Sequence, residues 1–180
     1  MSKKATNAEN QQERLMRIGW IVGFVDGEGC FSINLVKQSN RKEKDRVRKG
    51  YKTGYQVMHE FAVTQGVSSL NCLQTIKEFF GVGALYINKR YDNHKENLYR
   101  YCVRRREDLI DVVIPFFERY ELQTSKNENF KMFAKTVREV IDGKHLTKGG
   151  IIKIAERTQL MNHKKDRSEL IRILRNQTSD

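Results

Sequence analysis

Two carboxylate residues, Asp26 and Glu28, stand at the end of the first apolar, periodic segment of the chain. Glycines recur around them at four-residue spacing, at Gly19, Gly23 and Gly27, so on a helix they share one side. Each glycine within a helix costs about 1 kcal/mol relative to alanine, and three on one side indicate the close approach of a second backbone. Carboxylates are disfavoured at the negative end of a helix macrodipole, which marks this end as a candidate functional site. The pattern predicts a closely packed helix pair that presents carboxylates to a metal ion.

The composition favours one domain over residues 1–180 and a polyanionic partner. Lys and Arg number 34 against 22 Asp and Glu, which leaves a formal net charge of +12. A surplus of this size points to nucleic acid ahead of a membrane surface. No apolar run approaches the roughly 20 residues that span a bilayer and no secretory segment is evident, so we expect a soluble, intracellular protein without membrane association. The three cysteines are widely spaced and form no CxxC pair, which argues against a disulfide or zinc framework.

Hydrophobic periodicity predicts the elements and their order. We expect residues 1–10, which are polar, to be disordered. The pattern then predicts a helix at about 11–27, strands at about 30–38 and 54–65, a helix at about 69–80, two strands between 84 and 104, a helix at about 107–118, and helices at about 126–141, 148–161 and 167–174. This order predicts an α+β fold with one four-stranded antiparallel sheet, helices on one face of it, and a C-terminal helical extension over residues 146–180.

A strongly basic loop is predicted between the first two strands. Residues 37–52 carry eight Lys and Arg side chains against Glu43 and Asp45, a net of +6 that is half the excess of the whole chain. A charge run is usually a solvated loop, and that interpretation stays open. The position between two strands also suits an arm that contacts phosphates.

The outward face of the predicted sheet is rich in amides and arginines. Such a face is poor material for a core but suits the readout of base edges, since Arg pairs with guanine and Asn or Gln with adenine in the major groove. A merely solvated face is the alternative, and the net charge favours nucleic acid over it. The residues predicted to contact DNA are Ser32, Asn34, Gln38, Arg48, Gln56, Tyr86, Asn88, Arg90, Arg100 and Arg104.

The segment Trp20-Ile-Val-Gly-Phe-Val-Asp-Gly-Glu-Gly29 resembles the signature of the LAGLIDADG homing endonucleases. The predicted αββαββα order is the core of that family. Further similarities lie at residues 61–65 (FAVTQ), 115–117 (PFF) and 122–126 (LQTSK), and residues 146–162 look like members found in organellar and bacterial introns. The resemblance covers about residues 15–162 and implies a location in a bacterial cytoplasm or in an organelle such as a chloroplast or mitochondrion.

The resemblance implies a role for each position that matches the family pattern. Glu28, the last acid of the signature, would bind the catalytic divalent ions, expected to be Mg²⁺, with the Gly27 carbonyl as a further ligand. Asp26 would be structural. Gln65 matches a position that orders water near the scissile phosphate, and Lys126 matches a basic residue that stabilises charge or adjusts the nucleophilic water.

One signature occurs in this chain, and a single acid site cuts one DNA strand, so cutting both strands needs two copies. We therefore expect an intron-encoded endonuclease that acts as a homodimer, with Gly19, Val22 and Gly23 at the interface. It would make a metal-dependent double-strand break in a long, roughly palindromic DNA site. Two other functions stay open: a maturase that binds intron RNA, and a non-cleaving DNA-binding regulator on the same fold. The presence of Glu28, Gln65 and Lys126 together favours the nuclease.

Overall fold

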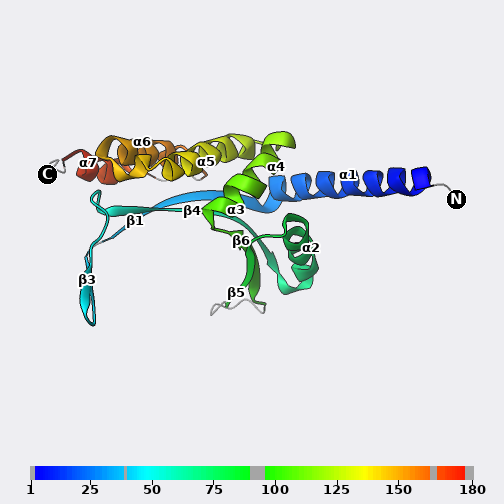
Figure 1. The fold of residues 1–180 in the computed structure, drawn as a ribbon, viewed down its shortest axis with the longest axis horizontal. Coiled ribbons are helices and arrows are strands. Elements are labelled where there is room, and N and C mark those ends of the chain that lie inside the picture. Colours follow the sequence, from blue (N-terminus) through cyan, green and yellow to red (C-terminus); the bar gives the residue numbers. More distant parts are fainter. Residues whose placement is uncertain (1–2, 39, 90–95, 163–165, 177–180) are drawn as a thin grey trace. The chain divides into compact units, whose positions relative to one another are not determined.

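The computed structural model describes residues 3–38, 40–89, 96–162 and 166–176. Figure 1 shows a mixed arrangement of helices and strands. The elements are α1 (Lys3–Glu28), β1 (Gly29–Lys37), β2 (Arg41–Glu43), β3 (Arg46–Arg48), β4 (Tyr55–Gly66), the 3-10 turn η1 (Val67–Ser69), α2 (Leu70–Phe80), β5 (Ala84–Asn88), β6 (Leu98–Val103), α3 (Arg106–Asp108), the π-helical turn η2 (Leu109–Val113), α4 (Ile114–Arg119), α5 (Lys126–Ile141), the 3-10 turn η3 (Lys144–Leu146), α6 (Lys148–Gln159) and α7 (Ser168–Asn176). Apart from β2 and β3, this is the predicted αββαββα order followed by C-terminal helices, and the α+β fold class is confirmed.

Four strands form one sheet in the order β1-β4-β6-β5. Strand β6 pairs antiparallel with both β4 and β5, so that Tyr101 lies opposite Val63 on one side and Leu85 on the other. Along β1, buried Phe31 and Ile33 alternate with more exposed neighbours. This period of two gives the sheet one apolar and one polar face, as the sequence predicts.

Contacts between residues group the chain into two compact units, whereas the sequence predicts one domain over residues 1–180. The first unit comprises Met1–Cys30 and Phe61–Asn127, and the second comprises Phe31–Glu60 and Glu128–Asp180. Strands β1 and β4 each contribute residues to both units.

The core of the first unit centres on the ring of Phe61 in β4. Phe80 of α2 and Tyr101 of β6 lie 6.1 Å from it, and Phe117 of α4 lies 5.6 Å from it, all edge to face. Edge-to-face pairs contribute about 0.5–1.5 kcal/mol each beyond the burial of their surface. One aromatic cluster therefore holds two strands and two helices of this unit together.

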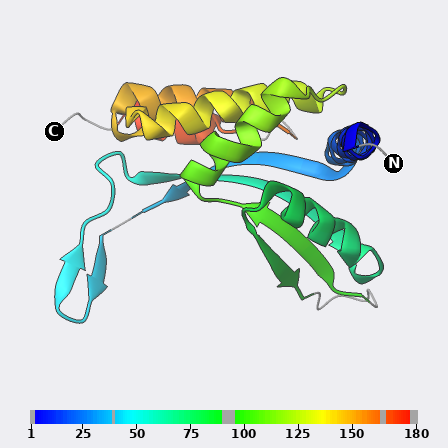
Figure 2. The ribbon, with the colours of Figure 1, turned by 45° about the vertical axis from the view of Figure 1, so that its right-hand side comes forward.

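The second unit packs helices against residues 31–37 and 55–60 of the sheet. Phe31 of β1 lies 5.2 Å from Phe130 and 5.4 Å from Phe133, both on α5. Arg157 of α6 donates two hydrogen bonds to Glu139 of α5, at 2.7 and 3.0 Å, and these bonds lower the pKa of the Glu139 carboxyl. Figure 2 shows α5, α6 and α7 (yellow to red) together on one side of these strand segments.

Helix α1 begins at Lys3, so the expected disorder of residues 1–10 is wrong for residues 3–10. A helix is costly to nucleate but cheap to extend, and Lys, Ala and Glu in this stretch are good helix formers. The helix therefore extends from its packed C-terminal half into a polar N-terminal half, where apolar residues do not recur at helical spacing. Within the described ranges, no helix combines the length and apolar character needed to cross a membrane.

The basic stretch is a β-hairpin and not the predicted loop. Strands β2 and β3 pair antiparallel, with Lys42 opposite Val47. Lys44 and Asp45 form the two-residue turn between them, a turn length that suits hairpins, and Asp is favoured in turns.

The predicted helix at 107–118 is present but is interrupted by a π-helical turn over Leu109–Val113. Pro115 lies at the start of the following helical segment, α4. Proline has no N–H to donate to the carbonyl four residues before it, and its ring crowds that carbonyl. The wider turn just before the proline accommodates both effects.

Candidate active site

The Asp26 carboxylate holds the segment that leads into α5. Its Oδ2 accepts hydrogen bonds from the backbone N–H of Gln123 at 2.8 Å and of Thr124 at 3.0 Å. The Thr124 hydroxyl donates to Oδ1 at 2.6 Å. Asp26 thus braces the end of α1 against a segment almost 100 positions away, and its predicted structural role is confirmed.

Lys126, the first residue of α5, lies against the C-terminal end of α1. Its Nζ donates to the carbonyl oxygens of Val25 and Gly27, both at 3.0 Å. Carbonyls in the last turn of a helix lack intrahelical partners and carry partial negative charge, so a cation is favourable there. Burial lowers the pKa of Lys126, and the neighbouring charges of Asp26, Cys30 and Glu28 oppose that shift. Two predicted site residues, Gly27 and Lys126, are therefore in direct contact.

Glu28 is the last residue of α1, and its side chain is exposed. The next residue, Gly29, begins β1, where the chain turns back over Val25. A Cβ at Gly29 would lie 2.6 Å from Val25 Cγ1 and 2.7 Å from the Val25 carbonyl oxygen. Only glycine fits this close approach, so Gly29 is what allows β1 to start directly after Glu28.

Gln65 lies on β4 opposite Tyr99 of β6 and is half-buried. Within the described residues, no hydrogen bond joins Gln65 to Glu28 or to Lys126. The structure thus gathers Gly27, Glu28 and Lys126 at the end of α1, and the water-ordering role of Gln65 stays a prediction. The Thr124 hydroxyl was not predicted as a partner of Asp26, although its segment was noted in the family resemblance.

The donor atoms at the end of α1 suit a hard divalent cation such as Mg²⁺. Glu28 offers an exposed carboxylate and Gly27 a carbonyl, and Mg²⁺ prefers oxygen ligands of both kinds. The Gly27 carbonyl already accepts a hydrogen bond from the Lys126 ammonium, which leaves the second lone pair of this oxygen for a metal ion. In the described part of the chain, His, Cys, Asp and Glu side chains do not gather in any group of three or more. The fit therefore rests on Glu28 and Gly27.

The predicted dimer interface is an open face of α1. A Cβ added at Gly19, Gly23 or Gly27 would meet no atom of this chain within 4 Å. Ile21, on the opposite side of the helix, is fully buried, and Val22 is half-buried. The glycine face thus has room for a second backbone.

The side chains predicted to contact DNA lie on the outward face of the sheet or on the hairpin, except Arg90, which is outside the described residues. Asn34, Arg48, Tyr86, Asn88 and Arg104 are exposed, and Ser32, Gln38, Gln56 and Arg100 are half-buried. In the first unit, the Arg104 guanidinium lies 5.2 Å from the centre of the Tyr86 ring. In the second unit, Gln38 Nε2 donates to Gln56 Oε1 at 2.7 Å.

The β2–β3 hairpin carries exposed basic side chains, which are Lys42, Lys44, Arg46 and Arg48, and the exposed Lys49 directly follows it. Figure 1 shows the hairpin (cyan) extending away from the helices of its own unit. This placement leaves its charges accessible to a polyanion, as a phosphate-contacting arm requires.

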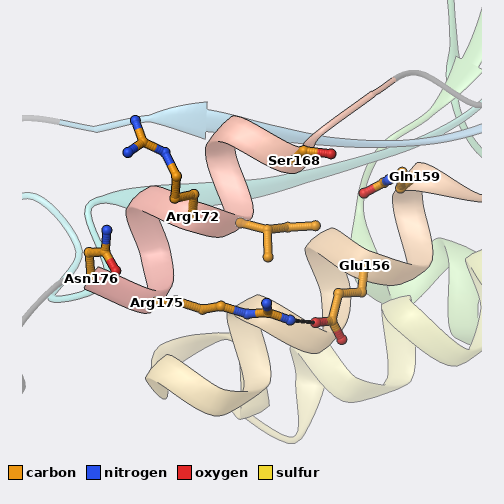
Figure 3. A pocket seen from close by; sticks show the side chains of 7 residues that line it. Glu156, Gln159, Ser168, Arg172, Arg175 and Asn176 are labelled. Atoms are coloured by element: carbon orange, nitrogen blue, oxygen red, sulfur yellow. Dashed lines mark hydrogen bonds and ion pairs between the residues drawn. The ribbon is translucent and has the colours of Figure 1, made fainter.

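A separate groove lies between α6 and α7 and contains none of the predicted site residues (Figure 3). Arg175 crosses it to Glu156 at 2.7 Å. Arg172, also in its lining, pairs with Glu169 at 2.8 Å. Because the acid in this lining is already ion-paired, we place the candidate active site at the end of α1.

Comparisons with known proteins point to one family. Residues 21–137 match the family model described as LAGLIDADG endonuclease. The chain is 34% identical over 116 residues to the probable intron-encoded endonuclease Cox1-I1b of Schizosaccharomyces pombe, which covers 64% of this chain and 26% of that protein. It is 30% identical over 131 residues to an uncharacterised 50.9 kDa protein in ND4 intron 1 of Podospora anserina, which covers 72% of this chain and 25% of that protein. The chain thus spans about a quarter of the length of these relatives.

Solved structures show the same fold. The crystal structure of the homing endonuclease I-TnaI matches with a TM-score of 0.68 and 35% identity, over 87% of this chain and 94% of that chain. The structure of I-SmaMI bound to cleaved DNA matches with a TM-score of 0.70 and 31% identity, over 86% of this chain and 46% of that chain.

Proposed function

The chain belongs to the LAGLIDADG endonuclease family, and on that premise we propose that it is an intron-encoded homing endonuclease that cleaves both strands of a long DNA site. The observation that carries the proposal is the end of α1, where the exposed Glu28 follows the Gly27 carbonyl that contacts Lys126. The net charge of +12 and the basic β2–β3 hairpin support duplex DNA as the substrate.

Each residue at this helix end has a distinct part in the proposed reaction. Glu28 and the Gly27 carbonyl would hold Mg²⁺, and a bound ion would supply charge neutralisation at the scissile phosphate and a more acidic water. Lys126 keeps a positive charge beside the phosphate, and Gln65 orients water through its amide. Asp26 does not react; by holding residues 123 and 124 it fixes the segment from which Lys126 extends.

We propose that the active form is a homodimer joined through the glycine face of α1. The open space over Gly19 and Gly23 supports this arrangement, because two helices that meet through glycines can approach closely. A second copy brings a second Glu28, and with it an acid for the second DNA strand. The two-fold symmetry of such a dimer suits a roughly palindromic site.

The test offers the purified chain, with Mg²⁺, a duplex that joins the exon sequences on either side of the intron encoding it. We expect the parent to cleave both strands, and Glu28→Gln to bind this duplex without cleaving it. Glu78→Gln changes an exposed glutamate of α2 in the same way and should cleave like the parent. Equal cleavage by Glu28→Gln and the parent would refute the role of Glu28. Binding of intron RNA without cleavage of the duplex would indicate a maturase, and duplex binding alone would indicate a regulator.

A further inference from the structure

Gln38, which directly follows β1, and Gln56 of β4 have their side chains together on the outward face of the second unit. Gln38 Nε2 donates to Gln56 Oε1 at 2.7 Å. Further along, the Ser32 hydroxyl donates to the Glu60 carbonyl at 3.4 Å. Residue numbers thus fall along β1 as they rise along β4, so the two strands are antiparallel.

The next side chains on the same face are apolar. Side chains alternate between faces along a strand, so the residues two steps inward from the glutamine pair are Val36 on β1 and Met58 on β4. Val36 is 43% exposed and Met58 is 42% exposed, whereas Val57, which points to the other face, is 3% exposed. We call Val36, Gln38, Gln56 and Met58 the amide–apolar patch.

Charge and position favour a polyanionic partner for this patch. Residues 38–54, which connect the two strands, contain the basic β2–β3 hairpin, so positive charge lies at the edge of the patch. Helices α5 to α7 of this unit lie on one side of these strand segments, and Phe31, which alternates with the patch residues, packs on α5 (Figure 2). An outward strand face beside a basic arm fits a nucleic acid duplex, because the arm can hold phosphates while the face meets base edges.

We propose that the amide–apolar patch reads A·T base pairs in the major groove, an inference that rests on the proposed DNA endonuclease function. Gln38 uses one N–H on Gln56 and keeps its Oε1 and a second N–H, the acceptor and donor that adenine N6 and N7 require. The bond between the amides also fixes their orientation before DNA binds, which lowers the entropic cost of the contact. Val36 and Met58 present carbon surfaces, which match the thymine C5-methyl group. A G·C pair has no such methyl.

The experiment selects duplexes that the chain of residues 1–180 binds from a randomised library without divalent cations, and then modifies single bases of the enriched duplex. We expect enriched duplexes with recurrent A·T pairs. Replacing a contacted thymine with deoxyuridine, which lacks only the methyl group, should weaken binding roughly fourfold. Replacing a contacted adenine with 7-deazaadenine, which lacks the N7 acceptor, should weaken binding roughly two- to tenfold. These changes leave the protein intact, so they do not depend on how any variant folds.

Protein variants then assign the effect to the patch. In Met58→Ser, replacing the thymine that Met58 contacts with deoxyuridine should no longer weaken binding. In Gln38→Ala, replacing the contacted adenine with 7-deazaadenine should no longer weaken binding. Ile87→Ser removes another exposed apolar side chain, 55% exposed, from β5 and should leave both effects unchanged. Enriched duplexes that tolerate both base changes would overturn the inference, as would equal behaviour of Met58→Ser and Ile87→Ser. Failure to enrich any duplex would instead overturn the proposed function itself.

Discussion

Replacing Asp26 with Asn should destabilise the junction between the end of α1 and residues 123–124 without changing a residue assigned to the chemistry. The carboxylate receives three hydrogen bonds of 2.6–3.0 Å from Gln123 and Thr124. Hydrogen bonds to a charged group contribute about 1.5–3 kcal/mol each. An Asn amide keeps one oxygen acceptor but directs N–H groups at the remaining donors. Because the site is partly exposed to water and one acceptor remains, we expect the free energy of unfolding to fall by about 2–3 kcal/mol rather than by the full sum.

Thermal unfolding followed by circular dichroism measures this loss. For a chain of this size about 1 kcal/mol corresponds to roughly 2–4 °C, so the Tm of Asp26→Asn should fall by about 5–10 °C. Thr124→Val removes only the hydroxyl donor and should cost about 1 kcal/mol. Once Asp26 is replaced, that second change should cost much less, because the two side chains share one interaction.

Glu28→Gln is the matched control for this experiment. It removes a negative charge from the C-terminal end of α1, so its Tm should equal or slightly exceed that of the parent. An Asp26→Asn variant that unfolds within about 1 °C of the parent would show that Asp26 does not brace this junction. A greater loss of stability in Glu28→Gln would reverse the division of roles between the two acids.

Three further substitutions test other parts of the molecule. Glu139→Gln should lower the free energy of unfolding by roughly 3 kcal/mol in urea titrations near neutral pH, because it leaves the largely buried Arg157 without its charged partner. Since this pair holds the folded-state pKa of Glu139 below its ordinary value, its contribution is complete above that value and is lost as the pH falls through the folded-state pKa. Parent and variant should therefore converge in acid, and a constant gap would contradict this. Gly150→Ala should lower the Tm more than Gly149→Ala, because a Cβ at position 150 overlaps a backbone carbonyl while position 149 is open; equal effects would contradict the packing described for η3 and α6. Gly23→Leu should convert the dimer to a monomer in analytical ultracentrifugation while the circular dichroism spectrum is kept, and an unchanged sedimentation coefficient would contradict the proposed interface.

The long helices could be predicted from sequence because their signal is local. The predicted helix at 126–141 has the same bounds in the structure, and its apolar period corresponds to buried side chains such as Phe130, Val137 and Val140. A core-facing stripe repeats within the segment itself, so no knowledge of its partner is needed. The end of α1 was predictable for a different reason: misplaced carboxylates and repeated glycines break local rules, and such breaks mark functional positions.

Contacts between distant segments could not be predicted in the same way. Nothing in the residues around Thr124 shows that its hydroxyl meets Asp26, because the pairing depends on the three-dimensional path between them. The β2–β3 hairpin was missed because its strands are only three residues long and contain one apolar residue, Val47, so they have no alternating apolar pattern. The half-buried Gln65 illustrates the same limit, since the sequence does not show which group a polar side chain on a strand will contact.

The two opposed faces of α1 have a consequence for how much sequence variation the helix can tolerate. Residues 10–17 are all exposed, whereas from position 18 onward Ile18, Ile21 and Val25 are buried in the core of their unit and Gly23 stands on the open face. In the proposed dimer, residues 18–29 therefore combine core, interface and active-site constraints within three helical turns. We therefore expect these positions to tolerate fewer substitutions than most others in the chain. Engineering of the protein toward a new DNA target should leave this segment unchanged and vary the outward strand face instead.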